Sequence, residues 1–273
     1  TFRDQIAKLT IEMPQCPVAI DINLCNTSAK LAHTIMMLSG VYDEVYQTSG
    51  VVQAFLARGK VGGRTMTGRN QKHLVKDRTI GNSDANSLYP SAMARLDGYL
   101  KGKPKVIDPE KHSLEWLSQQ SGYVVEVKVK SVRKRLNFPL QSKKVRGIRN
   151  FTNNLNGTNL TMDNIALEDF MEYHNVKPEH MQIIRGYYYD EGHNDTICNV
   201  IKYLYAERRK YKKMRNPIEK SYKLILNSAY GYSILKPVDS EIVIKHKKEL
   251  EKYVSTWFNY IKSYTMSQDG RYA

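Results

Sequence analysis

The stretch "DTICNVIKYLYAERRKYKKMRNPIEKSYKLILNSAYG", from Asp195 to Gly231, has the apolar spacing of two successive amphipathic helices. Its first part carries large apolar side chains at positions i, i+3, i+4 and i+7, which lie on one helix face. Pro217 interrupts this pattern, because proline lacks the helical N–H and its ring clashes with the preceding turn. The sequence therefore predicts an antiparallel helical hairpin. The first apolar stripe consists of Ile197, Val200, Ile201 and Leu204.

The predicted hairpin also has two polar, mainly cationic faces. Lys223, Asn227 and Tyr230 fall at i, i+4 and i+7 of the second helix. Arg208 and Lys212 fall at i and i+4 of the first helix. If the helices pack through their apolar stripes, we expect these two sets of polar side chains to face one cleft. A triphosphate is the small ligand that fits such a cleft best, because Arg and Lys donors bind its oxygens strongly. The alternative is a basic helix pair exposed to solvent.

The charge of the chain favours a polyanionic partner. The 273 residues contain 42 Lys and Arg against 27 Asp and Glu, a formal net charge of +15, so nucleic acid is the first partner to consider. We expect no membrane partner, because no apolar run approaches the roughly 18 residues of a membrane-spanning helix. Nor does the beginning of the sequence resemble a cleavable signal.

The cysteines predict neither a disulfide framework nor a zinc site. Cys16, Cys25 and Cys198 are odd in number and fit no metal-ligand spacing. We therefore expect a reducing intracellular compartment, which leaves cytoplasm, nucleus and virus-associated locations open.

Upstream of the hairpin, the sequence predicts one helix and then a loop. The segment 26–39 has helical spacing, with Asn26, Thr27 or Ser28 as its cap and Gly40 just beyond its end. The following "GKVGGRTMTGR", residues 59–69, has four glycines in eleven residues and is predicted to be a loop.

Period-two patterns predict strands in the middle of the chain. "GYVVEVKVKSV", residues 122–132, alternates valines with charged residues, and "MQIIRGYYY" (181–189) and "SEIVIKH" (240–246) are also β-capable. We expect "RNFTNNLNGTNLTMDN", residues 149–164, to be a loop and "NIALEDFMEYHN", residues 164–175, to be a helix.

The stretch around Asp84 combines a β-capable piece, a turn and a helix. In "RTIGNSDANSLYPSAMARL" we expect Asp84 to end a short strand, followed by a tight turn. A helical run follows Pro90, because proline suits the first turn of a helix.

These stretches together resemble the family B DNA polymerases. "DANSLYPS", residues 84–91, resembles motif A of the protein-primed branch, which includes enzymes of small phages and virus-like mobile elements. "KLILNSAYG", residues 223–231, resembles motif B, and "RRKYKK", residues 208–213, resembles the cationic first helix of the fingers. "KVGGR", residues 60–64, resembles the glycine motif before the polymerase region. The resemblance covers roughly residues 50 to 245.

The resemblance implies a catalytic role for the motif A stretch. Asp84, with Ala85 beside it, would bind Mg²⁺ in a two-metal site that stabilises the attacking oxygen and the leaving pyrophosphate. Tyr89 would lie under the sugar and exclude a 2′-hydroxyl, while Leu88 and Pro90 shape the turn. The alternative for Asp84 is a helix N-cap.

The resemblance also assigns roles on the hairpin. Lys223 would contact the α-phosphate as a second catalytic residue, and Arg208 and Lys212 would contact the β- and γ-phosphates. Arg209 or Lys213 takes these roles if the helix is rotated by one residue. Asn227 and Tyr230 would line the nascent base-pair pocket, and the alternatives for them are a buried amide and a core aromatic residue. The predicted DNA-contacting residues are Gly62, Gly63, Ser87, Lys134, Ser228 and Gly231.

The pattern departs from the family in two ways. The family takes a second metal-binding carboxylate from an Asp-Thr-Asp-like motif C hairpin, and this sequence contains no such stretch. The family's amino-terminal exonuclease region is also missing, so we expect the chain to be an incomplete catalytic unit. Residues 101–194 form an insertion that, by the resemblance, would contact a terminal priming protein and duplex DNA. Its basic runs "KSVRKR" and "KKVRGIR" suit a phosphate backbone, with ordinary surface as the alternative.

Together these patterns predict an α+β fold with part of a polymerase palm, an antiparallel sheet with helices, plus a helical-hairpin fingers subdomain. The predicted function is template-directed DNA synthesis on a DNA primer-template with deoxynucleoside triphosphates. The first alternative is a non-catalytic nucleic-acid-binding polymerase remnant. The second is an RNA-directed polymerase, against which "NSAYG" and Tyr89 argue. The predicted regions are 1–59 (lead-in), 60–100 (palm), 101–194 (insertion), 195–232 (fingers) and 233–273 (return to the palm).

Overall fold

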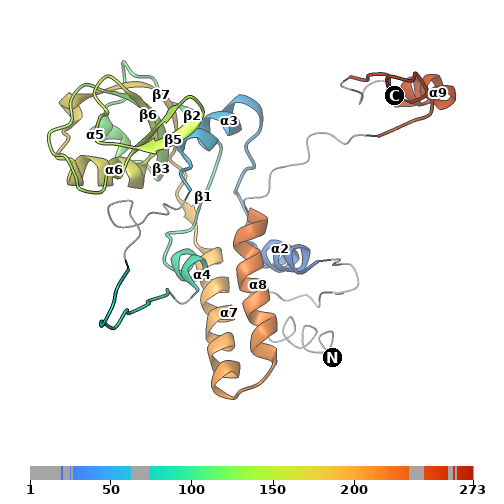
Figure 1. Cartoon of the computed structure of the whole chain (residues 1–273), viewed down its shortest axis with the longest axis horizontal. Coiled ribbons are helices and arrows are strands. Elements are labelled where there is room, and N and C mark those ends of the chain that lie inside the picture. The colour runs from blue at the N-terminus through green and yellow to red at the C-terminus, as the bar shows by residue number, and fades with distance from the viewer. Residues whose placement is uncertain are drawn as a thin grey trace. The chain divides into compact units, whose positions relative to one another are not determined.

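The computed structural model describes residues 20, 25, 27–62, 74–85, 87–233, 243–257, 261 and 263–272 (Figure 1). Two compact units divide the chain, Thr1–Ser233 and Ile234–Ala273. The larger unit has two separate hydrophobic cores, one among helices and one at a β-sheet.

The helical core lies where three helices meet. Helices α7 (Thr196–Lys213) and α8 (Ile218–Ser233) form the predicted antiparallel hairpin, and α2 (Ser28–Leu38) packs against α8 (Figure 1). The short helix α4 (Leu88–Met93) contacts both hairpin helices. The whole apolar stripe predicted for the first hairpin helix is buried in this core.

Helix α2 confirms the segment predicted as 26–39. Its N-cap is Thr27, whose hydroxyl accepts a hydrogen bond from the Lys30 N–H at 3.1 Å. Such a cap satisfies one of the N–H groups that the first helical turn leaves free. The helix ends before Gly40, whose φ of 75° suits a residue without a Cβ.

The second core lies at a four-stranded antiparallel sheet with strand order β2-β7-β3-β6. The strands are β2 (Lys105–Val106), β3 (Gly122–Val129), β6 (Asn159–Asp163) and β7 (Met181–Tyr189). Val125, Val127 and Val129 are fully buried, as their alternation predicts. Helices α5 (Leu114–Leu117) and α6 (Asn164–Tyr173) add Leu117, Leu167 and Phe170 to this core, which confirms the predicted helix at 164–175.

The loop predicted at 149–164 is wrong, because two strands overlap it. β5 (Ile148–Phe151) pairs with β4 (Ser142–Val145), and β6 occupies the end of the segment. Leu160 and Met162 point into the sheet core opposite the valines of β3, so two alternating apolar residues outweigh the polar composition around them.

Three further elements complete the larger unit. Helix α3 (Gly50–Gly59) contacts β6, so the predicted glycine-rich loop begins only at Lys60, and residues 63–69 lie outside the described part. A two-stranded ladder joins β1 (Tyr99–Leu100) to β8 (His193–Asn194). The short 3₁₀ turn η3 (Pro178–His180) precedes β7.

The strand predicted to end at Asp84 is not formed. Residues 79–85 have no strand, and Ile80 is 71% exposed. A strand needs a neighbour to accept its backbone hydrogen bonds, and the described residues offer none to this segment. The helix predicted after this turn is present as α4, with Pro90 buried in its first turn.

The smaller unit contains helix α9 (Lys247–Trp257), which the sequence patterns did not predict. The β-capable stretch 240–246 forms no strand in its described part, 243–246, where His246 makes one isolated antiparallel bridge to Tyr272. Across the described part of the whole chain, no helix is both long and apolar enough to cross a membrane.

Gly186 in β7 is predicted to be essential for the sheet. A Cβ at this position would lie 2.4 Å from the Val124 carbonyl oxygen and 2.7 Å from the Ile107 Cδ1 atom. We expect Gly186→Ala to lower the free energy of unfolding by about 1–3 kcal/mol, the typical cost of overpacking. Urea denaturation followed by circular dichroism measures this change.

The matched control is Gly231→Ala in α8, where a Cβ would meet no atom within 4 Å. Because alanine favours the helix, this variant should gain roughly 0.5–1 kcal/mol. Equal effects of the two substitutions would contradict the close approach of β3 and β7.

Candidate functional site

A cationic cleft of about 370 Å³ lies along one side of α7. Four cationic side chains from two turns of the helix line it, together with Tyr205 and with Ser87 from the turn before α4. The cleft therefore joins the stretch predicted to be motif A with the helix predicted to be the first of the fingers. Its cationic residues are Arg208, Arg209, Lys212 and Lys213.

Arg208 is the cation of this cleft with the most contacts to other elements. Its Nη1 atom donates a hydrogen bond to the Ser87 hydroxyl at 2.5 Å, and its Nε atom lies 3.3 Å from the Glu219 carboxylate. The Arg208 and Glu219 side chains are 14% and 24% exposed. One guanidinium thus links α7, α8 and the turn before α4.

Ser87 adopts an unusual backbone conformation in that turn. Its φ of 50° and ψ of 53° are left-handed, which is uncommon for a residue other than glycine. The Ser87 carbonyl accepts the Ser91 N–H at 2.9 Å, and its hydroxyl accepts from Arg208 rather than capping the helix. These bonds hold the turn at the mouth of the cleft.

Tyr89 and Tyr230 bring the two predicted motifs into direct contact. Their rings stack with centroids 4.3 Å apart and planes within 5° of parallel. Tyr89 is 56% exposed, and Tyr230 is half-buried and also packs against the helical core. More than half of the Tyr89 surface therefore stays exposed in this contact.

The structure does not bring all predicted cations together. Lys212 lines the cleft with Arg208, but Lys223 is an exposed residue of α8 outside its lining. Asn227 is also exposed, so the alternative of a buried amide is wrong. Because Arg209 and Lys213 line the same cleft, the choice between the two pairs of cations stays open.

Asp84 and Ala85 lie exposed in the segment before Ser87. The N-cap of α4 is Ser87, so the alternative of Asp84 as its cap is wrong. Among the described residues, no group of three or more His, Cys, Asp or Glu side chains could hold a metal ion. These residues do not amount to a complete magnesium site.

The other predicted DNA contacts are scattered. The Ser228 hydroxyl lies 3.2 Å from the Ser28 hydroxyl of α2, and Gly231 borders open space. Gly62 and Lys134 are exposed on other segments, and Gly63 lies outside the described residues.

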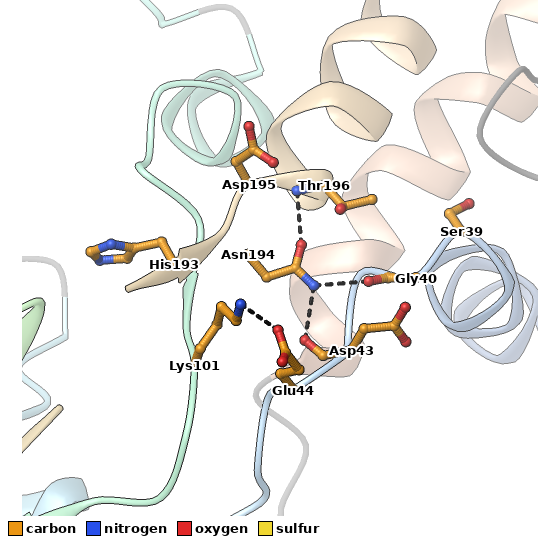
Figure 2. A pocket seen from close by; sticks show the side chains of 9 residues that line it. All are labelled: Ser39, Gly40, Asp43, Glu44, Lys101, His193, Asn194, Asp195 and Thr196. Atoms are coloured by element: carbon orange, nitrogen blue, oxygen red, sulfur yellow. Dashed lines mark hydrogen bonds and ion pairs between the residues drawn. The ribbon is translucent and has the colours of Figure 1, made fainter. Parts of the chain in front are cut away.

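A second hollow, of about 330 Å³, lies where the end of α2 meets the start of α7 (Figure 2). The Asn194 side-chain amide donates to the carbonyls of Gly40 and Asp43, at 2.9 and 3.0 Å, and its oxygen accepts the Thr196 N–H. An ion pair of Lys101 with Glu44 closes one side. The bonds of Asn194 link the turn after α2 to the segment just before α7, as Figure 2 shows.

The sequence analysis missed Glu219 as the partner of Arg208. A hairpin that turns near Pro217 brings residues at equal sequence distances from the turn into pairs, as in the stacked Tyr211–Tyr222 pair. The Arg208–Glu219 pair does not follow that symmetry, because Glu219 lies much closer to Pro217 in sequence than Arg208 does. Folding the sequence about the turn would therefore find the tyrosine pair but not Glu219.

The model of the organellar and viral type B DNA polymerases matches residues 1–270. The chain belongs to this family. The predicted family B resemblance is therefore confirmed. A search of curated proteins finds no significant match to this type B chain.

Two solved structures of Phi29 DNA polymerase are similar to the type B chain. One, in complex with primer-template DNA, is 20% identical with a TM-score of 0.50, over 75% of this chain and 34% of that chain. The other, an orthorhombic crystal form, is 21% identical with a TM-score of 0.53, over 81% of this chain and 38% of that chain. These matches confirm the predicted α+β polymerase fold, and the type B chain matches only about a third of either Phi29 chain.

Glu219 is predicted to compete with anions for Arg208. We expect Glu219→Gln to tighten the binding of inorganic tripolyphosphate about 1.5- to 5-fold, the range for one partly exposed ion pair. Isothermal titration calorimetry at fixed ionic strength measures the affinity.

Glu207→Gln is the matched control, because Glu207 pairs with Lys210 outside the cleft lining. Glu207→Gln should change the affinity for tripolyphosphate less than Glu219→Gln does. A weaker affinity in Glu219→Gln would instead mean that the carboxylate holds Arg208 in its binding position.

Proposed function

We propose that this chain forms the fingers and part of the palm of a DNA-directed DNA polymerase, which adds deoxynucleotides to a primer on a DNA template. The observation that carries the proposal is the stack of Tyr89 on Tyr230 beside the cationic cleft. It places the motif A and motif B stretches against each other, next to donors suited to a triphosphate. Membership of the type B family supports the same reaction.

In this proposal the cleft binds the incoming triphosphate. Arg208 and Lys212 contact the β- and γ-phosphates, with Arg209 and Lys213 as alternatives lining the same space. Lys223 approaches the α-phosphate from α8, a position that requires the substrate to reach beyond the cleft. Because the transferred phosphoryl group carries charge on several oxygens, such fixed cations stabilise the transition state.

The stacked tyrosines serve the sugar and the base. The exposed face of Tyr89 lies under the deoxyribose and excludes a 2′-hydroxyl, with Leu88 shaping the same turn. Tyr230 and Asn227 lie on the α8 face that borders the nascent base pair. Tyr89 is held in place by its stacking on Tyr230.

Magnesium is the expected cofactor, since DNA polymerases generally use it. When bound, the two ions stabilise the attacking and leaving oxygens of the transfer. Asp84, with Ala85 beside it, is proposed to provide one ligand, and a second carboxylate has to come from a motif C hairpin. The described residues alone do not form this site.

The proposed macromolecular partner is primer-template DNA. Phi29 DNA polymerase, whose fold this chain shares, is complexed with primer-template DNA in one of the similar structures. The basic segment that carries Lys134 is exposed and suits a phosphate backbone. A terminal priming protein is a further proposed partner, through the insertion at residues 101–194.

Asp84→Asn tests the proposed reaction. In the full-length gene product with primer-template and magnesium, we expect incorporation to fall about 100-fold or more, because several kcal/mol of transition-state stabilisation are lost. Affinity for primer-template should stay near that of the parent protein. Asp77→Asn, in the same exposed segment, is the control and should retain activity.

Primer extension and fluorescence anisotropy measure the two quantities. Full activity of Asp84→Asn would refute the metal-ligand assignment. A parent protein that binds primer-template but extends no primer would favour the non-catalytic remnant.

Tyr89→Ala tests the sugar assignment. Removing the ring opens the space under C2′, so incorporation of ribonucleotides relative to deoxyribonucleotides should rise about tenfold or more. Tyr89→Phe keeps both the ring and its stacking and should retain the parent ratio. An unchanged ratio of kcat/KM values in Tyr89→Ala would place the sugar elsewhere.

A further inference from the structure

A second cluster of hydrogen-bond donors lies at the end of the central strands β3 and β7, where the 130–135 segment passes the η3 turn. The Lys130 N–H donates to the His180 carbonyl at 2.8 Å, so the two segments are bonded to each other at the backbone. Arg133 and the His180 ring meet beside this bond. Neither residue has a role in the proposed nucleotide cleft.

The η3 turn determines which nitrogen of His180 carries the proton. The ring Nδ1 atom lies 3.0 Å from the Lys177 backbone nitrogen and accepts its N–H. A backbone N–H can only donate, so Nδ1 has to be the unprotonated nitrogen. The neutral ring then carries its hydrogen on Nε2 and donates there.

Arg133 faces that same Nε2 atom. Its Nε and Nη2 atoms lie 3.3 and 3.1 Å from it, and a guanidinium has donors only. Donor therefore faces donor, and the two side chains cannot satisfy each other. If the proton lay on Nδ1 instead, the Nδ1–H group would face the Lys177 backbone N–H, and two donors would again face each other. An acceptor that receives hydrogen bonds from both groups would resolve it.

The backbone around Arg133 is firmly held although it belongs to no strand. The Val132 N–H donates to the Asn156 side chain at 2.9 Å, and the Lys134 N–H donates to the His174 carbonyl at 2.9 Å. The backbone on either side of Arg133 is thus held before any ligand arrives, which lowers the entropy cost of binding.

The surroundings favour an anionic acceptor from outside the chain. Exposed cations flank the pair on both segments. Among the described residues, Glu179 is the acidic group closest to the His180 ring; its carboxylate lies 3.9 Å from Nε2, and its side chain is 69% exposed. At that distance it makes no hydrogen bond to the ring. The flanking cations are Lys130, Lys134, Arg135 and Lys177.

We propose that Arg133 and His180 together bind one phosphate of a nucleic-acid backbone. The guanidinium and the Nε2–H donate to its non-bridging oxygens, and the flanking cations lie near the neighbouring phosphates. The choice of nucleic acid as the source of the phosphate rests on the proposed function, whereas the need for an acceptor rests on the donor geometry alone.

The test compares Arg133→Ala with Arg135→Ala, which removes the same charge from the same segment. We expect the affinity for a short duplex oligonucleotide, measured by fluorescence anisotropy, to fall about 3- to 10-fold in Arg133→Ala and less than half as much in Arg135→Ala. Glu179→Gln should raise the affinity about 1.5- to 5-fold, because it removes the nearest competing carboxylate. Equal losses in the two arginine variants would mean a diffuse basic surface and would overturn the proposal.

Two further measurements separate the sources of phosphate and the two sites. Inorganic phosphate alone should shift the His180 ring signals in NMR spectra only weakly, and the oligonucleotide should shift them strongly. A strong shift with phosphate, combined with unchanged oligonucleotide affinity in Arg133→Ala, would identify free phosphate as the ligand and overturn the nucleic-acid assignment. Tripolyphosphate binding at the Arg208 cleft should be unchanged in Arg133→Ala, so failure of this site is distinguishable from failure of the proposed polymerase function.

Discussion

The packing of α8 between α2 and α7 is the interaction on which the candidate site depends. Ile225, Leu226 and Ala229 of α8 are buried in this core, and each large side chain removed from water contributes about 1.5–3 kcal/mol. With the apolar face of α8 fixed inward, Glu219 lies against Arg208 and Tyr230 lies against Tyr89. The polar contacts of the cleft are thus consequences of apolar packing elsewhere on the same helix.

The two groups of hydrogen-bond donors in the larger unit, the cationic cleft and the Arg133–His180 pair, lie at two different hydrophobic cores. The cleft belongs to the helical core, whereas Arg133 and His180 are held at the sheet, whose core is built from other residues. In each group an arginine lies beside a segment held by hydrogen bonds of its backbone, the Ser87 turn in one and the 130–135 segment in the other. A net charge of +15 alone would attract nucleic acid without such alignment.

Helices α2, α6, α7 and α8 were predictable from sequence because their buried residues recur at helical spacing. Strand β6 was missed because only Leu160 and Met162 carry its pattern among polar neighbours. The strand expected before Asp84 failed for a different reason, since strand formation depends on a partner that local sequence does not reveal. For the candidate site, the sequence predicted which cationic residues take part. It did not predict the bonds of Arg208 to Ser87 and Glu219, because these depend on tertiary structure.

The distance in sequence between α2 and α8 has a consequence for synthesis on the ribosome. All buried residues of the sheet core lie between Ile107 and Met181, and Ile183 and Tyr188 pack against it, so this core can close once the chain has emerged to the end of β7. Helix α2 emerges much earlier but buries Leu31 and Ile35 against α8, nearly 190 residues later. Contacts of such long range form slowly. Between the synthesis of α2 and that of α8, the apolar side chains of α2 therefore lack their main partner, which exposes the nascent chain to aggregation.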